Sequence, residues 1–208
     1  MENIDRIFYV NLAKRVDKRE QIEGELKEHL DVVDYEGRVE RFDAIEDVNG
    51  AIGCSMSHLE ILKIAKEREY KYVMVFEDDF MFLKGKAGFY ADLANLFALV
   101  ENGSLDFKVI MLSYNAIDRV GYNGFLDRTT NVQTTAGYLL NCAYIDAMID
   151  NFSRGIELFK VTGEHWNYAV DQYWKKEQKD KWYLFKNRIG KQRAGLSDIG
   201  GCFSDNGF

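Results

Sequence analysis

Three consecutive carboxylates, Glu77, Asp78 and Asp79, are the residues of this sequence with the clearest capacity for chemistry. They directly follow an apolar run at 72–76, Tyr-Val-Met-Val-Phe, that is typical of a buried strand. Because successive strand side chains point to opposite faces, we expect Glu77 and Asp79 to share a side while Asp78 turns away. Two carboxylates on one side of a strand end can hold a hard divalent cation. An acidic turn that merely ends a strand in solvent is the alternative.

The elements around these acids predict where they lie in the fold. A strand that is apolar on both faces belongs inside a parallel sheet, and such sheets bind ligands at the carboxyl ends of their strands. The sequence alternates strand and helix patterns, so we predict one α/β domain over residues 1–208, with a mostly parallel central sheet and helices on both faces. Strands are expected at 6–12, 39–45, 109–112 and within 132–140; helices at 17–30, 56–68, 89–100, 145–152 and 164–177; irregular chain at 121–130 and beyond 186.

Composition excludes several classes of function. The chain has 208 residues, 47% of them apolar, and a net charge of −7 without a basic cluster, which argues against nucleic-acid binding. Three scattered cysteines, Cys54, Cys142 and Cys202, lack metal-ligand spacing and are typical of free thiols in a reducing compartment. The sequence shows no leader and no segment long enough to span a membrane, so we expect a soluble, cytoplasmic protein.

Other polar residues could serve a site, but each has a simpler explanation when taken alone. Ser57 and Glu60 fit a capping box, so Ser57 could be present only to start a helix. His58 could be a hydrogen-bonded core histidine. Arg15 and Arg19 could be surface charges, and Asp171 could face solvent. The segment 134–138, Thr-Thr-Ala-Gly-Tyr, could be only a tight turn.

The order of these motifs along the chain resembles that of glycosyltransferase family 25, the group of bacterial lipooligosaccharide transferases and animal collagen galactosyltransferases. The resemblance runs from about residue 4 to 199, and its most specific parts are Gly-Cys-Ser-Met-Ser-His at 53–58 and Glu-Asp-Asp at 77–79. The other matching segments are Asn11-Leu12 with Arg15 and Arg19, Thr-Thr-Ala-Gly-Tyr at 134–138, Val170-Asp171 and Ser197-Asp198-Ile199.

The resemblance implies a GT-A-like, Rossmann-type fold and an inverting transferase that moves a sugar, galactose or glucose, from a UDP-sugar donor to a hydroxyl of a glycan or other hydroxylated acceptor. It implies Mn²⁺ (or Mg²⁺), with Asp79 as the direct ligand. Glu77 is expected as a second ligand, or beside Asp78 in placing the ribose or a metal-bound water. The donor site would also take in Asn11, Arg15, Ser57 and His58. Asp171 matches an acidic position of the family, and we expect it to be the catalytic base.

Two further functions remain open from the residues themselves. A glycoside hydrolase also needs a pair of carboxylates, but sets them apart across a sugar cleft, which a contiguous triplet fits poorly. A non-catalytic relative that only binds a nucleotide sugar would keep the fold and lose turnover. Metal-dependent binding of UDP distinguishes a transferase from a hydrolase, and turnover of a UDP-sugar distinguishes it from the inactive relative.

Overall fold

The structure is a computed structural model that describes residues 1–196 and 203–204. Of the residues singled out above, Ser197, Asp198, Ile199 and Cys202 lie outside this part of the chain. The strands are β1 (Arg6–Asn11), β2 (Val39–Asp43), β3 (Tyr72–Glu77), β4 (Phe80–Phe82), β5 (Val109–Met111), β6 (Asn115–Ala116), β7 (Val120–Gly121), β8 (Leu126–Arg128), β9 (Val132–Gln133), β10 (Gly137–Asn141), β11 (Trp182–Phe185), β12 (Gly190–Gln192), β13 (Gly195–Leu196) and β14 (Phe203–Ser204). The helices are α1 (Val16–His29), α2 (Val32–Arg38), α3 (Gly50–Glu67), α4 (Lys86–Glu101), α5 (Ile145–Thr162), α6 (His165–Tyr168) and α7 (Val170–Tyr173), with 3-10 turns η1 (Cys142–Tyr144) and η2 (Trp174–Glu177).

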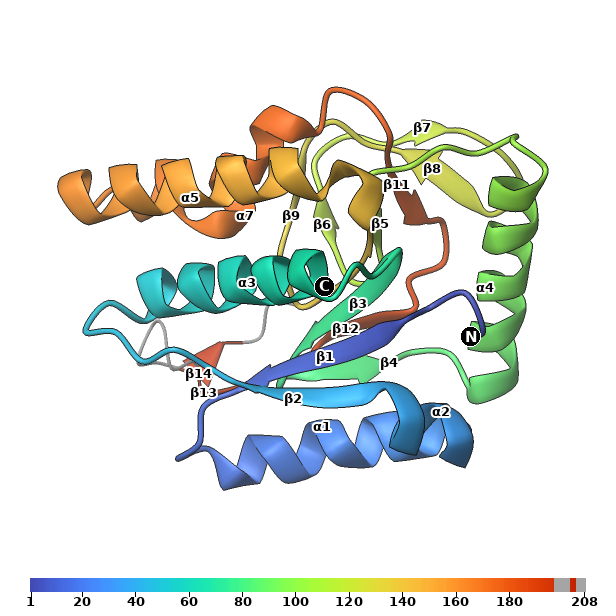
Figure 1. The fold of residues 1–208 in the computed structure, drawn as a ribbon, viewed down its shortest axis with the longest axis horizontal. Helices are drawn as coiled ribbons and strands as arrows, with labels where there is room; N and C mark the ends of the chain where they lie inside the picture. Colours follow the sequence, from blue (N-terminus) through green and yellow to red (C-terminus); the bar gives the residue numbers. More distant parts are fainter. Residues whose placement is uncertain (197–202, 205–208) are drawn as a thin grey trace.

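Eight of these strands form a central sheet in the order β2-β1-β3-β10-β5-β11-β8-β7. All but β10 and β8 point the same way, so the expectation of a mostly parallel sheet is confirmed. Helices α3 and α5 cover one face, and α1 lies against the other (Figure 1). The two-stranded pair of β4 and β12 adds a small second sheet beside it.

The core has two halves because the central strands are apolar on both sides. Val73 and Val75 of β3 pack with the α3 and α5 side chains, whereas Met74 and Phe76 pack with those of α1 and α4. All four are fully buried. The apolar run at 72–76 is therefore a central strand, as its composition predicts.

Several helix and strand boundaries differ from the prediction. Helix α3 begins at Gly50 rather than at 56, because Asn49 caps it by accepting the N–H of Ala51. The helix expected at 164–177 is broken into α6, α7 and η2, because Ala169 is extended, with φ −56° and ψ 152°. Segments expected to be irregular contribute β8, which pairs with β11 of the central sheet, and β12, which pairs with β4.

The topology gathers one set of residues at one edge of the sheet. Strands β1, β2 and β3 are parallel, so Asn11, Asp43 and Glu77 end at the same edge. Strand β10 runs the opposite way and pairs Gly137 with Phe76, so the preceding segment 134–136 arrives at that edge as well. Among the described helices, none combines the length and the apolar character that crossing a bilayer requires.

Candidate active site

A cleft of about 450 Å³ opens at this edge of the sheet, and we call it the carboxylate cleft. Its volume lies within the range of small-molecule sites in proteins. The three acids at 77–79 line it together with side chains from β1, the start of α1, the loop 44–48 and the chain after β12. The polar ones among them are Asn11, Lys14, Arg15, Asp17, Lys18, Gln21, Glu46, Asp47, Cys54, Gln192 and Arg193.

Asp79 is the most perturbed of the acids. Burial, together with the charges of Glu77 and Asp78, raises its pKa to about 8. Its Oδ1 atom is buried and has no hydrogen-bond partner in the described chain, while Oδ2 only meets Gln192 at 3.5 Å. An unpartnered carboxylate oxygen beside other acids has the chemistry of a ligand for a hard divalent cation.

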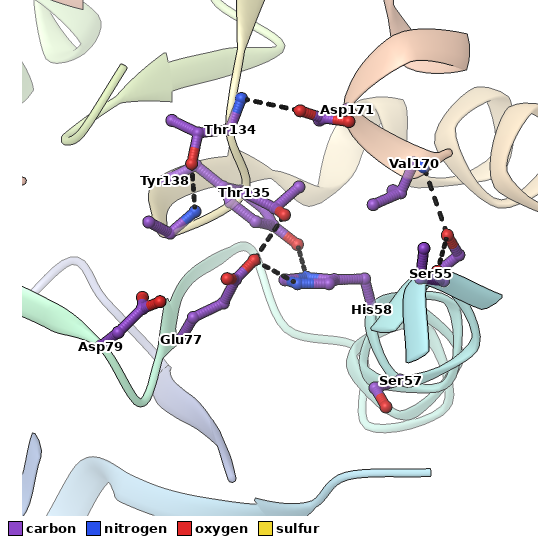
Figure 2. Close-up of polar contacts among 12 residues, drawn as sticks. Ser55, Ser57, His58, Glu77, Asp79, Thr134, Thr135, Tyr138, Val170 and Asp171 are labelled. Carbon is purple, nitrogen blue, oxygen red and sulfur yellow. Dashed lines mark hydrogen bonds and ion pairs between the residues drawn. The ribbon is translucent and has the colours of Figure 1, made fainter. Parts of the chain in front are cut away.

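Glu77 is held in place from two directions (Figure 2). His58 Nε2 lies 3.3 Å from Glu77 Oε1, and the Thr135 hydroxyl donates to the same oxygen. Burial would raise the pKa of this carboxyl, but His58, Thr135 and Lys18 together keep it below its usual range. Tyr138 in turn places its hydroxyl 3.0 Å from His58 Nδ1. Glu77 therefore remains ionised beside Asp79.

The Asp78 carboxylate has other partners than Glu77. The Asn11 amide donates to its Oδ2 at 2.8 Å, and Lys18 Nζ lies 3.7 Å from its Oδ1. Strand alternation stops at Glu77, because residues 78 and 79 form a turn before β4. The three carboxylates thus reach one cleft with different surroundings.

The segment 53–58 brings helix α3 against the loop that forms one wall of the cleft. A Cβ at Gly53 would lie 2.4 Å from the Ile45 carbonyl oxygen, so only glycine fits this approach. The Ser57 hydroxyl donates to the Gly53 carbonyl and accepts the Ile45 N–H, both at 2.8 Å. Ser57 therefore lies inside the helix and tethers the loop, and the idea that it starts the helix is wrong.

Asp171 lies on α7, across the site from Glu77 (Figure 2). Its Oδ2 accepts the Thr134 N–H at 3.3 Å. Thr134 has φ 77°, an uncommon backbone conformation for a β-branched residue. Burial raises the pKa of Asp171, and the charge of Glu77 raises it further. Asp171 does not line the carboxylate cleft itself.

Of the expected donor-site residues, the cleft is lined by Asn11, Arg15, Glu77, Asp78 and Asp79, whereas Ser57 and His58 support it from behind. Arg15 donates to the Asp17 carboxylate from Nε, at 2.9 Å, and from Nη2, at 2.7 Å. Arg19 pairs with Glu23 instead.

Sequence reasoning missed Lys18 and Arg193. The side chain of Lys18 is only 12% exposed at the cleft, and Arg193 donates its backbone N–H to the Asp79 carbonyl. The sequence signal that could have identified Lys18 is its spacing of three and four residues from Arg15 and Lys14. Arg193 had none, since only the β4–β12 pairing brings it to the acids.

Cys54 also faces the site. It lines the cleft, and burial raises the pKa of its thiol well above the usual value, with the charges of Glu77, Asp171 and Asp79 adding to the effect. Cys142 is half-buried at the start of η1, beyond the opposite end of β10.

The cleft lies at the carboxyl ends of the parallel strands and is lined by both acidic and basic side chains. This is the usual place of the ligand site in open α/β folds. Comparison with known proteins specifies the family. A profile of glycosyltransferase family 25 (LPS biosynthesis protein) matches residues 48–174, and the chain belongs to this family. The match includes the 53–58 segment, the three acids and Asp171. A search among curated proteins found no match.

Three solved structures are similar to this chain. A glycosyltransferase involved in the glycosylation of the major capsid of PBCV-1 superposes with a TM-score of 0.52 at 7% identity, over 90% of this chain and 92% of that one. A197 from STIV gives 0.48 at 10% identity, over 98% and 96%. The glycosyltransferase GlyE of Streptococcus pneumoniae TIGR4 gives 0.48 at 10% identity, over 88% of this chain and 45% of that one. The expected GT-A-like fold is confirmed, and family membership supports sugar transfer over glycoside hydrolysis.

Proposed function

We propose that this protein transfers a hexose, galactose or glucose, from a UDP-sugar to a hydroxyl of a glycan or other hydroxylated acceptor, with inversion and with Mn²⁺ (or Mg²⁺) bound at the acids. The observation that carries the proposal is the buried oxygen of Asp79 beside Glu77, which has no hydrogen-bond partner among the described residues, in a cleft that also holds Arg15 and Lys18.

The residues present fit the metal. Asp79 and Glu77 are oxygen ligands of the kind that Mn²⁺ and Mg²⁺ prefer, and a divalent charge would offset the repulsion that raises the pKa of Asp79. When bound, such an ion would stabilise the charge that develops on the leaving diphosphate. Lys18 and Arg15 line the same cleft and would add positive charge to that stabilisation. The Asn11 amide donates to Asp78 Oδ2 and to the Arg15 backbone carbonyl.

The transfer forms a bond from the acceptor oxygen to the anomeric carbon and breaks the bond from that carbon to the β-phosphate oxygen of UDP. The acceptor proton has to leave as the first bond forms, and we assign the Asp171 carboxylate as the base that takes it. A general base works best when its pKa approaches the working pH, and burial moves the pKa of Asp171 in that direction. Attack from the side opposite the leaving group gives inversion.

Calorimetry with UDP tests the donor site directly. We expect UDP to bind more tightly with Mn²⁺ than with a chelator, and Asp79→Ala to abolish that difference. Asp146→Ala is the matched control, because Asp146 is an exposed acid that pairs with Lys66. Equal affinity with and without metal in the native chain would contradict the proposal. A panel of UDP-sugars with Mn²⁺, scored for UDP release with and without acceptors, then identifies the donor.

A further inference from the structure

Beside the proposed donor metal lies a second group of ligand atoms of a different kind. Cys54 and His58 are four residues apart on α3, so their side chains lie on one face of the helix, one turn apart. Glu77 comes to the same place from the end of β3. One ligand atom of each, sulfur, ring nitrogen and carboxylate oxygen, lies within 4.8 Å of the other two.

This set differs in chemistry from Asp79. Mn²⁺ and Mg²⁺ prefer oxygen, whereas a thiolate together with an imidazole selects Zn²⁺. We propose that Cys54, His58 and Glu77 form a zinc site, and that zinc bound there inhibits the protein by taking Glu77 from the donor metal. Three protein ligands leave a fourth position of tetrahedral zinc to water.

The geometry needs little change to accept the ion. His58 Nε2 and Glu77 Oε1 are 3.3 Å apart, and two ligand atoms about 2.0 Å from tetrahedral zinc are separated by about 3.3 Å. A sulfur at about 2.3 Å from zinc would lie about 3.6 Å from the nitrogen. Because the two atoms already lie within 4.8 Å of each other, their separation has to shorten by at most about 1.2 Å. The thiol loses one proton to solvent as its sulfur coordinates.

The surroundings of His58 suit a zinc ligand. Tyr138 lies at Nδ1, which leaves Nε2 directed at Glu77 (Figure 2). A metal-bound histidine usually binds the ion through one ring nitrogen and makes a hydrogen bond through the other, which fixes the orientation of the ring. Cys54 lines the carboxylate cleft, so zinc has a path from solvent to the site.

Cobalt and zinc binding to the full chain, in a buffer without thiol reductant, tests the site without reference to activity. We expect Co²⁺ to give a thiolate-to-cobalt charge-transfer band, and zinc to displace it. Cys54→Ser should lose the band and bind zinc at least about tenfold more weakly, whereas Cys142→Ser and Cys202→Ser should keep both properties. The absence of the band in the native chain, or a zinc affinity of Cys54→Ser equal to that of the native chain, would contradict the proposed zinc site.

Should Cys54→Ser fail to fold, the double variant Cys142→Ser, Cys202→Ser decides, because a thiolate band that survives in it can only come from Cys54. The inhibitory half of the inference rests on the proposed function and has its own measurement. Zinc should slow Mn²⁺-dependent release of UDP from a UDP-sugar in the native chain, and should do so less in Cys54→Ser, each relative to its own zinc-free rate. Full activity at saturating zinc would overturn inhibition. A chain that turns over no UDP-sugar would contradict the proposed function, while the cobalt spectrum still decides the zinc site.

Discussion

At the scale of single residues, adjacent carboxylates of the same site differ in what they can do. Glu77 is kept ionised by His58 and Thr135, whereas Asp79 is buried next to other acids and holds its proton to a higher pH. Environments that push carboxyl pKa values apart are typical of catalytic sites. With a pKa of about 8, Asp79 is mostly protonated at neutral pH, and a bound cation would favour its ionised form.

Asp171→Asn tests the assignment of the base. The asparagine keeps the size of the side chain and an oxygen for the Thr134 N–H, but it cannot take a proton. Transfer should fall by about 10²- to 10⁴-fold while UDP affinity stays nearly unchanged. Steady-state rates and UDP calorimetry on the same preparations measure the two effects.

Glu164→Gln is the control for that variant, since it makes the same chemical change on the neighbouring segment, where the Glu164 carboxylate accepts from the Asn167 amide. The base has to be ionised, and the pKa of Asp171 is raised. As pH decreases, the native rate should therefore begin to fall at a pH above the usual pKa range of a carboxyl group. Full transfer activity in Asp171→Asn would exclude it as the base, and lost UDP affinity would place it in the donor site.

At the scale of elements, helix α3 links the loop 44–48 to the acids. Gly53 allows close contact with Ile45, Ser57 bonds the same loop residue, and His58 orients Glu77. One helical segment thereby positions both a wall and a carboxylate of the cleft. This gives the residues at 53–58 a physical role that does not require direct contact with a ligand.

Gly53→Ala should disturb this link. A methyl group 2.4 Å from the Ile45 carbonyl forces the backbone apart, and overpacking of this kind costs about 1–3 kcal/mol. We expect a lower melting temperature and weaker UDP binding, because the loop lines the cleft. Gly24→Ala on α1 is the matched control, since a Cβ there meets nothing within 4 Å; it should gain up to about 1 kcal/mol. Equal melting temperatures for the two variants would refute the close approach.

At the scale of the whole molecule, the central sheet fixes the spatial relation between segments that are far apart in sequence. Parallel β1 and β3 bring Asn11 to Asp78, and antiparallel β10 brings Thr135 to Glu77. The same assembly buries acidic groups close together, and the burial and repulsion of their charges lower the free energy of unfolding. That cost should appear as a dependence of stability on pH.

Asp79→Asn should stabilise the metal-free protein at high pH. The pKa of Asp79 is about 8 in the folded chain against 3.8 ordinarily, so its favourable contribution, complete below pH 3.8, is lost progressively as pH rises through the folded pKa. The asparagine variant lacks this loss. With a chelator at pH 8 its melting temperature should exceed the native value by about 2–4 °C, which is about 1 kcal/mol, and the gap should close toward pH 4.

Scanning calorimetry across this pH range, with Asp146→Asn as the exposed control, measures the effect. Mn²⁺ should raise the melting temperature of the native chain and not of Asp79→Asn, because an ion that binds only the folded state stabilises it. A gap that does not change with pH would contradict the raised pKa of Asp79.

The sequence alone determined the local pattern of this protein. The apolar run at 72–76 specified a central strand, helical periodicity specified α1, α4 and α5, and the order of motifs identified the family. These inferences depend on side-chain period and chain order, which neighbouring residues carry by themselves. The acids at the end of β3 were found for the same reason.

Contacts between distant segments were decided only by the tertiary structure. The tether from Ser57 to Ile45, the position of Asp171 against Thr134, and the arrival of Arg193 at Asp79 all require the sheet to be assembled. The break at Ala169 likewise follows from packing, since Val170 N–H donates to the Ser55 hydroxyl on α3. Local propensity is weak compared with such contacts, so the sequence located the acids while the fold selected their partners.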